Sequence, residues 1–482
     1  MEEQLFILEE LNPSLYCVNA RIIAHNFDWS IFKPVEFPYY KAREGFNKQK
    51  GNSSCPKERA KEEEFLLFDM SLLETKEPEG TGSNPRGAGR KGEDFFSLLK
   101  IFTLAPYYEA EQNAEAIWRR LVQNPDYRLD CGFQNLSDVP AARTLRRFNE
   151  IMYIYGLWTE VRKIAVLENM ETGIIGSSGS LAVDPTHLDG FAKVKNPAKE
   201  CKECDKKEIC DEVKYTCDMN DIVSKSKNYK VPGVKAALIS DPTSELPISG
   251  MAFNARVYDG EAEKVLIPLL KQVDEEYPAL KEQVDTILAD GAFDSKANRE
   301  ACNILNASLL APINPRNHKE FLATKSRGIA RIDKYGVPHC IENYKLHLLT
   351  KDTKLNQYIW GCPVFNPDCR IEGLSCSKKD ECSPNSQYGR TLRTNKDDYL
   401  QIDWENPQHL KSNKKEYCGR TSIERTISRV KRCLPFERFW NRGKKALQAH
   451  IDRAILALNM FASAAVRLGK KHLMRSPLQT LA

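Results

Sequence analysis

Apolar residues recur every three or four positions in two parts of the chain, and this period predicts amphipathic helices. The first part begins at Asp94 with DFFSLLKIFTLAPYY and continues to about residue 170. The second part comprises two long patterns, 416–434 and 444–468, near the C-terminus. We therefore predict an all-α N-terminal domain at 94–175 and a pair of packed helices within 411–482.

Between these helical parts, short apolar runs alternate with turn residues, which is typical of strands. The runs predict strands at 181–184, 234–240, 246–257, 286–290 and 307–313, with helices at 260–273 and 295–305. Strands and helices in this order predict an α/β fold with a mixed sheet flanked by helices. We assign this sheet to residues 176–314.

Two further segments lack a clear period. Residues 1–93 mix short apolar runs with charge and end in a stretch rich in Gly and Pro, so we interpret them as an accessory segment and linker. Residues 315–410 are polar, irregular and rich in cysteine. We expect this second segment to be an insertion with few regular strands.

Composition narrows the class of protein. The chain has 482 residues, a formal charge of +5, 41% hydrophobic and 28% charged residues, which excludes a disordered chain and a membrane protein. The longest apolar stretch, 454–466, is interrupted by Asn459 and Ser463 and is shorter than the roughly 20 residues of a membrane span. The acidic N-terminus lacks an export signal. We expect a cytoplasmic protein without a membrane partner.

The cysteines fall into two groups. Their number, 15, is odd, which argues against a closed disulfide framework in a reducing compartment. The first group, within an insertion at about 195–225, has one C-x2-C spacing and favours structural Zn²⁺ over free thiols or an iron–sulfur cluster. The second group lacks that spacing and is a weaker zinc candidate, for which His339 and Cys340 could complete a site. The groups are Cys201, Cys204, Cys210 and Cys217, and Cys362, Cys369, Cys376 and Cys382.

Two predicted strands end in an aspartate, Asp184 and Asp290. Carboxylates at the carboxyl ends of neighbouring strands lie beside the crevice where open α/β sheets place their chemistry. Each aspartate is also typical of a turn, since Pro185 follows the first and Gly291 the second.

A third carboxylate lies on the helix predicted at 416–434. At about 100° per residue, Tyr417, Arg420, Glu424 and Lys431 share one face within about 60°. An apolar stripe borders that face, and a basic stripe that includes Arg425 lies beyond it. An ordinary amphipathic helix with solvated charges is the simpler alternative.

These motifs together resemble the DDE transposases of bacterial insertion sequences. The spacing of Tyr417, Arg420, Glu424 and Lys431 is similar to the Tyr-Arg-Glu-Lys signature of that superfamily. VDPTHLDG resembles the segment that carries its first aspartate, and LADGAFDS the segment that carries its second. VPAARTLRRFNEIM resembles part of its helical N-terminal domain.

The resemblance implies an RNase H-like fold with Asp184, Asp290 and Glu424 as the catalytic triad. Three carboxylates suit two Mg²⁺ or Mn²⁺ ions, which in this superfamily assist hydrolysis at the element ends and joining of the 3′-hydroxyl to target DNA. Asp189 and Asp294, close to the proposed ligands, are assigned to supporting or turn positions. The resemblance also implies a homodimer on double-stranded DNA, at the nucleoid.

Basic residues supply the candidate DNA contacts. The resemblance implies that Tyr417, Arg420 and Lys431 contact the DNA phosphate near the scissile bond. Arg425 belongs to a local excess of Lys and Arg between 411 and 445, which suits phosphate binding. A second candidate surface comprises Arg143, Arg146 and Arg147.

Two other functions fit the same residues. The chain could be a zinc-stabilised DNA-binding protein, derived from a transposase, that no longer cuts DNA. It could also be a metal-dependent nuclease that cleaves without joining. An intact triad favours the transposase.

Overall fold

The protein is described here by a computed structural model. It describes residues 15–52, 93–108, 113–176, 178–190, 222–226, 229–255, 257–314, 329–333, 337–395, 410–439 and 443–476. The cysteine group at 201–217 and most of the predicted linker lie outside these ranges. No helix within them is long and apolar enough to cross a membrane.

A mixed sheet forms the centre of the molecule. In the described residues it has seven strands: β1 (Ser180–Gly190), β2 (Ile222–Ser226), β3 (Tyr229–Asp241), β4 (Leu246–Phe253), β5 (Thr286–Leu288), β6 (Ser308–Leu310) and β12 (Arg438–Phe439). On one side of β1, β3 pairs antiparallel and in turn carries β2 and β4. On the other side, β5 and then β6 run parallel. The predicted mixed sheet is confirmed.

One strand differs from its prediction in a way that matters for the site. The strand predicted to end at Asp184 continues through Pro185 to Gly190. β1 pairs with β5 only as far as Ala182, and with β12 only from Asp189 onward. Between these two points β1 pairs with β3 alone. A proline is tolerated where a strand is paired on one side only. Asp184 therefore lies within a strand and not at its end.

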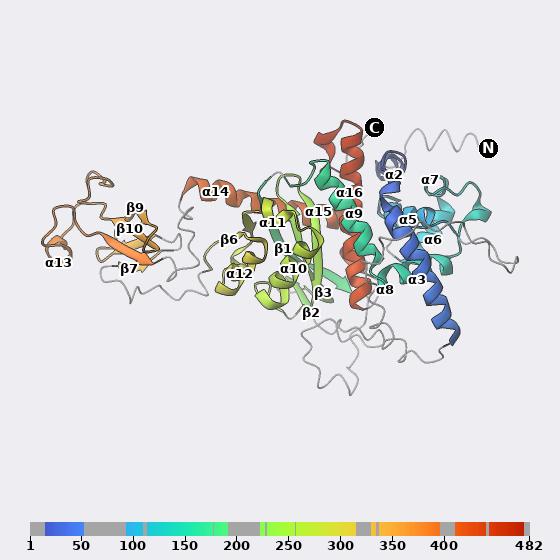
Figure 1. Ribbon diagram of the computed structural model, residues 1–482, viewed down its shortest axis with the longest axis horizontal. Helices are drawn as coiled ribbons and strands as arrows, with labels where there is room; N and C mark the ends of the chain where they lie inside the picture. The colour runs from blue at the N-terminus through green and yellow to red at the C-terminus, as the bar shows by residue number, and fades with distance from the viewer. Residues whose placement is uncertain are drawn as a thin grey trace.

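Helices gather at one end of the sheet (Figure 1). They are α2 (Leu15–Asn26), α3 (Lys33–Asn52), α5 (Phe95–Leu104), α6 (Ala114–Gln123), α7 (Pro125–Asp130), α8 (Ala142–Ile154) and α9 (Leu157–Glu171). The helical N-terminal region is confirmed, but it begins earlier than the period indicated. Residues 15–52, which show no clear pattern, form two α-helices whose apolar side chains, such as Ile23 of α2 and Val35 of α3, join the same core.

The C-terminal helix α16 (Lys444–Arg467) joins the helical region to the sheet. In Figure 1 it stands between the N-terminal helices and the strands, and it packs against both α9 and β4. Its residues from Ala449 to Ala465 are all buried, as expected for a helix covered on all sides. A single apolar core runs through all three layers.

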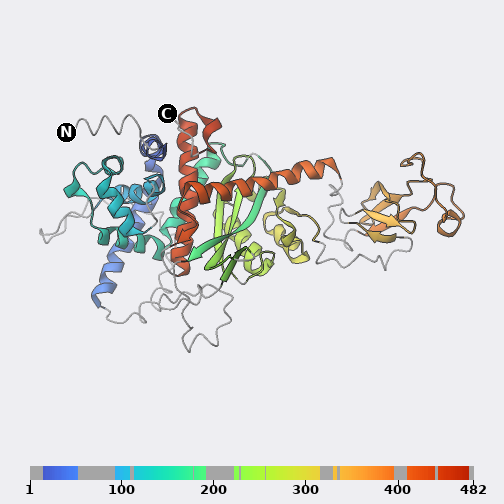
Figure 2. The same cartoon turned by 180° about the vertical axis from the view of Figure 1, so that it is seen from behind.

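The remaining helices lie along the sheet. The described segments give α10 (Ile267–Glu276) after a π-helical turn, α11 (Leu280–Gln283), α12 (Lys296–Ala301), α14 (Lys411–Tyr417) and α15 (Thr421–Cys433). A 3₁₀ turn, Cys418–Arg420, joins α14 to α15, and Figure 2 shows the two as one long rod across the strands. Contacts of α15 with β1 and β3 hold this rod against the sheet.

The segment at 315–410, predicted to be an insertion and called the insertion below, is more regular than the sequence indicated. Its described residues form a hairpin of β7 (Ile329–Ile332) and β8 (Pro338–Cys340), and a sheet of β9 (His347–Asp352), β10 (Gln357–Gly361) and β11 (Leu392–Asn395), with a short helix α13 (Lys379–Cys382). The expectation of few strands was wrong, because strands of three to six residues are too short to show a period. Figure 1 shows the insertion at the far end from the N-terminal helices.

Candidate active site

The register of β1 and β5 brings Asp184 and Asp290 together. The last pair between these parallel strands is Ala182 with Leu288, and each aspartate lies two residues beyond its member of that pair. Since side chains alternate along a strand, both aspartates project from the face to which Ala182 and Leu288 belong. Asp290 stays extended, with φ −77° and ψ 174°, so the alternation holds to the second aspartate.

The long helix brings Glu424 to the same place. Gly419 lies against β5 so closely that a Cβ added to it would be 2.9 Å from Leu288 Cδ1. This glycine lets the helix approach the strand that leads to Asp290. Glu424 follows in the first turn of α15 and is about half exposed.

A guanidinium group joins the carboxylates. Arg420 Nη2 lies 3.3 Å from Asp184 Oδ1, and Nη1 donates to Glu424 Oε1 at 2.5 Å. The side chains of Asp184 and Arg420 are only 17% and 16% exposed, so this ion pair is largely shielded from water. Arg420 thus holds together two carboxylates from elements far apart in the sequence.

The charges of the site act on one another. The pKa of Asp184 is raised to about 7. Burial is the main cause, the carboxylates of Asp290 and Glu424 add to it, and Arg420 acts in the opposite direction. Burial also raises the pKa of the Tyr417 hydroxyl, on which the same four charged groups act. Asp184, Asp290, Glu424, Tyr417 and Arg420 therefore form one electrostatic cluster, as a cluster of catalytic groups would.

The donor set fits a hard divalent cation, because it offers carboxylate oxygens only. Within the described ranges, no three His, Cys, Asp or Glu side chains are yet arranged to hold a metal ion. Here the cation between Asp184 and Glu424 is the guanidinium of Arg420. Holding a metal ion at this place requires that guanidinium to move aside.

The neighbouring aspartates have other partners. Asp294 is buried and accepts hydrogen bonds from Arg299 Nη2 and from the Asn314 backbone N–H, both at 2.8 Å. It thereby fixes the loop that follows Asp290. Asp290 also caps a 3₁₀ turn by accepting from the Ala292 N–H at 2.8 Å, so the turn interpretation and the site interpretation both apply to it.

Glu245 was not singled out from the sequence. It lies in the β3–β4 turn, is 5% exposed and has a φ of 56°. Its carboxylate pairs with Arg425, Arg429 and Arg475, and its carbonyl oxygen accepts from Thr426 Oγ1 at 2.9 Å. Three of these partners belong to α15, so the turn fixes the helix that carries Glu424. Arg425, predicted to contact DNA, is one of them.

The other predicted DNA contacts lie apart from the carboxylates. Lys431 Nζ is 3.5 Å from Glu437 Oε1 at the end of α15. On α8, Arg143 and Arg146 are exposed, and Arg146 pairs weakly with Glu115 at 3.5 Å. Arg147 is half-buried and lies over the ring of Phe46.

Residues of the insertion behave differently from one another. Trp360 is fully buried. His339 uses both ring nitrogens, one with Asp333 Oδ2 and one with the Asn343 carbonyl oxygen, each at 3.0 Å. The second cysteine group lies within the insertion and not beside the carboxylates, with Cys362 directly after β10 and Cys382 in α13.

The chain is similar to a solved structure and matches a sequence-family model. A solved structure described as a piggyBac transposase synaptic complex with hairpin DNA matches with a TM-score of 0.32 and 14% identity, over 80% of this chain and 70% of that chain. No curated protein matches the chain. The sequence model of the transposase DDE domain matches residues 218–460, half of the chain, and this range contains Asp290 and Glu424 but begins after Asp184. The chain belongs to the DDE transposase family.

Proposed function

We propose that this transposase cleaves DNA at the ends of a mobile element and joins the freed 3′-hydroxyls to target DNA, with Asp184, Asp290 and Glu424 as its catalytic triad. The observation that carries the proposal is the cluster of three carboxylates around Arg420, built from a strand, a strand end and a helix. Rigid elements hold catalytic groups more accurately than loops do.

The three carboxylates are the proposed ligands of Mg²⁺ or Mn²⁺. Two such ions would supply Lewis-acid activation of the attacking oxygen and stabilisation of the leaving oxygen. Once Arg420 leaves the carboxylates, its guanidinium is proposed to bind a DNA phosphate. Its Nε is buried and has no hydrogen-bond partner within the described residues, which leaves a donor for a phosphate oxygen. Tyr417 and Lys431 lie on the same helical rod and are proposed to contact the backbone beside it.

The fold supports the same assignment. We propose an RNase H-like catalytic domain of residues 176–314 and 411–482, since β1 lies between antiparallel β3 and parallel β5 and a helix supplies the glutamate. The helical region at 94–175 is proposed to bind the element ends through Arg143 and Arg146 on α8, with Arg147 contributing less because it is half-buried. Residues 1–93 and the insertion at 315–410 are proposed as accessory parts, and a homodimer on paired DNA ends as the active form.

The test uses purified full-length protein, Mg²⁺, and a linear DNA fragment that carries the sequences flanking its gene, mixed with a plasmid target. Asp184→Asn, Asp290→Asn and Glu424→Gln keep the side-chain shapes and remove the charges. Glu300→Gln is the matched control, because Glu300 is an exposed carboxylate paired only loosely with Lys296 at 3.6 Å. Strand cleavage and joining are measured on the same gel.

We expect each triad variant to lose cleavage by about 10³-fold, the effect of several kcal/mol of lost transition-state stabilisation. The control should cleave as the wild type does. A triad variant that cleaves at the wild-type rate would remove that residue from the triad. Wild-type protein that binds the DNA without cutting it would indicate the inactive DNA-binding alternative, and cutting without joining would indicate a nuclease.

A further inference from the structure

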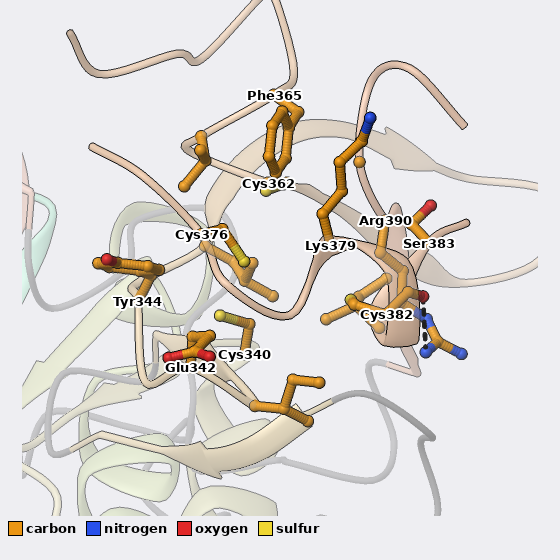
Figure 3. Close-up of a pocket in the computed structure, with 15 residues that line it drawn as sticks. Cys340, Glu342, Tyr344, Cys362, Phe365, Cys376, Lys379, Cys382, Ser383 and Arg390 are labelled. Carbon is orange, nitrogen blue, oxygen red and sulfur yellow. Dashed lines mark hydrogen bonds between the residues drawn. The ribbon is translucent and has the colours of Figure 1, made fainter. Parts of the chain in front are cut away.

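A pocket in the insertion is lined by four cysteines from four different segments (Figure 3). Cys340 ends β8, Cys362 follows β10, Cys376 lies in the loop before α13, and Cys382 ends α13. None of the four forms a disulfide. Thiols brought to one pocket from separate segments are typical of a site that a soft-ligand metal ion closes.

Cys369, which the sequence grouped with three of these residues, does not line the pocket. Its Sγ donates to the Cys362 carbonyl oxygen at 3.5 Å and lies next to Gly361, where an added Cβ would be 2.9 Å from the sulfur. Cys340 takes its place. The structure therefore changes one member of the predicted set.

Two backbone N–H groups, those of Glu342 and Tyr344, donate hydrogen bonds to the Cys340 sulfur. Burial nevertheless raises the pKa of the Cys340 thiol. The tight turn that aims these amides is fixed by bonds from Asn343 N to the Cys340 carbonyl and from Cys340 N to the Tyr344 carbonyl. Metal-bound thiolates need such donors, since the bound sulfur remains negative.

Other groups at the pocket support the same chemistry. Four thiolates around one Zn²⁺ carry a net charge of −2, and two cations, Lys379 and Arg390, line the pocket. Arg390 Nη1 donates to the Cys382 carbonyl oxygen at 3.4 Å, which holds it beside the end of α13. The one carboxylate of the lining, Glu342, accepts from Ser377 Oγ at 2.8 Å and is thereby engaged elsewhere.

We propose that Cys340, Cys362, Cys376 and Cys382 bind one structural Zn²⁺ in the insertion. The four sulfurs surround the pocket without yet forming a closed ligand set in the described residues, so binding draws the loops that carry them inward. This site is independent of the proposed DNA chemistry, because it shares no residue with the carboxylate cluster.

The ion would supply stability that the insertion lacks by itself. Its apolar cluster contains six buried residues of the insertion within the described ranges, Ile332, Val337, Leu346, Tyr358, Trp360 and Leu392, together with Ile313 just before it. Small cores of this kind usually need a metal ion or a disulfide. Bound zinc would tie the β7–β8 hairpin, through Cys340, to the β9–β10–β11 sheet, through Cys362.

The first test is the metal content of full-length protein purified without chelator, measured by mass spectrometry. Cys340→Ser and Cys376→Ser are compared with Cys369→Ser, the matched control. We expect Cys369→Ser to keep the zinc content of the wild type, and the other two to lose about one ion per chain. Comparing variants cancels any ion held by the separate group at 201–217. Equal loss in all three, no loss in Cys340→Ser, or iron in place of zinc would overturn the proposal.

A second test needs no variant and therefore remains decisive if a variant fails to fold. Wild-type protein is alkylated with iodoacetamide before and after treatment with a strong zinc chelator, and the modified peptides are quantified. The four proposed ligands should be alkylated at least tenfold faster after chelation, while Cys369 and the exposed Cys418 should not change. Chelation that leaves all four rates unchanged would exclude a bound ion at this pocket.

Discussion

The carboxylate cluster and the cysteine pocket are two groups of potential metal ligands in very different surroundings. Asp184, Asp290 and Glu424 project from a sheet and a helix that share one apolar core with the N-terminal helices and α16. The cysteines surround a pocket in an insertion with a separate cluster of buried residues. The first set of ligands is positioned by the fold, and the second set is proposed to help make the fold.

This difference has an energetic consequence. A large core can hold charges that repel one another, because the free energy gained by burying apolar side chains exceeds the free energy lost to the repulsion. A small core has little stability to lose, so its ligands must contribute stability when they bind. Chelation should therefore leave the catalytic core folded and loosen the insertion. The following predictions test each half of that contrast.

The largest effect is expected at the buried ion network that unites the core. Arg162 on α9 is fully buried, pairs with Asp452 of α16 at 2.9 Å and with Glu276 of α10, and donates to the Ile248 carbonyl of β4 at 3.1 Å. Arg162→Met should lower the free energy of unfolding by about 3–5 kcal/mol, because two carboxylates lose a buried partner. Urea unfolding followed by circular dichroism measures the loss.

Arg467→Met is the matched control for this prediction. Arg467 also joins α16 to α9, through Glu168 at 3.0 Å, but it is 38% exposed. An exposed pair contributes less than about 1 kcal/mol. If both variants lost the same stability, burial of the Arg162 network would not be what unites the layers.

The second prediction concerns the stability that the folded protein loses when Asp184 of the carboxylate cluster is ionised. The pKa of Asp184 is raised from 3.8 to about 7, mainly by burial and against the effect of Arg420. Its protonated form therefore stabilises the folded state below about pH 4, and this stabilisation is lost as the pH rises through about 7. In the presence of chelator, the free energy of unfolding of Asp184→Asn, measured relative to that of the wild type, should rise by about 2–3 kcal/mol from pH 5 to pH 8.

Urea unfolding at the two pH values, with Glu300→Gln as control, measures this gain. Added Mg²⁺ should reduce it by stabilising the wild type at pH 8. If the difference in unfolding free energy between Asp184→Asn and the wild type stays constant with pH, the ionised Asp184 does not destabilise the folded core.

Much of the half that holds the carboxylate cluster could be predicted from the sequence. The strands that hold Asp184 and Asp290 are continuous apolar runs, and the helix that holds Glu424 has a strong period, so local patterns suffice. Their meeting depends on the register of Ala182 with Leu288, which no local pattern contains. The predicted strand end at Asp184 failed because Pro185 indicated a turn, whereas β1 pairs on only one side at that point.

The features that sequence analysis missed depend on contacts between distant residues. Glu245 meets Arg425 across 180 positions of sequence, and nothing near Glu245 indicates a partner on the helix that carries Glu424. The insertion presents the same difficulty, since its strands are too short for a period and Cys340 meets Cys362 only after two sheets have formed. Spacing alone therefore placed Cys369 in the ligand set.

The third prediction tests whether the core positions its site through Glu245. Glu245→Gln keeps the turn and removes the charge that pairs with Arg425 and Arg429 of α15. We expect the free energy of unfolding to fall by about 2 kcal/mol, because hydrogen bonds to charged groups are worth about 1.5–3 kcal/mol. Cleavage should fall about tenfold, since residues that orient metal ligands have effects of about 10–100-fold.

Glu437→Gln is the control. Glu437 follows α15, pairs with Lys431 of that helix and is 43% exposed. It should change stability by less than about 1 kcal/mol. Glu245→Gln protein with wild-type stability and wild-type cleavage would show that α15 is positioned without this turn.

The smallest effect is expected from replacing a buried tryptophan in each of the two regions. Trp360 of the insertion and Trp158 of the helical core are both fully buried, and each donates its Nε1–H at 3.0 Å, to Thr394 Oγ1 and to Asn149 Oδ1 respectively. Substitution by Phe removes the same hydrogen bond from each, and should lower stability by about 1–2 kcal/mol.

Hydrogen exchange of backbone amides shows which strands are destabilised by each substitution. In chelator, Trp360→Phe should speed exchange in β9–β11 about tenfold and leave β1 and β3 unchanged, because the insertion opens by itself. Trp158→Phe should leave β9–β11 unchanged. Faster exchange in both regions from either variant would mean that insertion and core unfold as one unit, and the contrast between a site held by the fold and a site that helps to hold it would not stand.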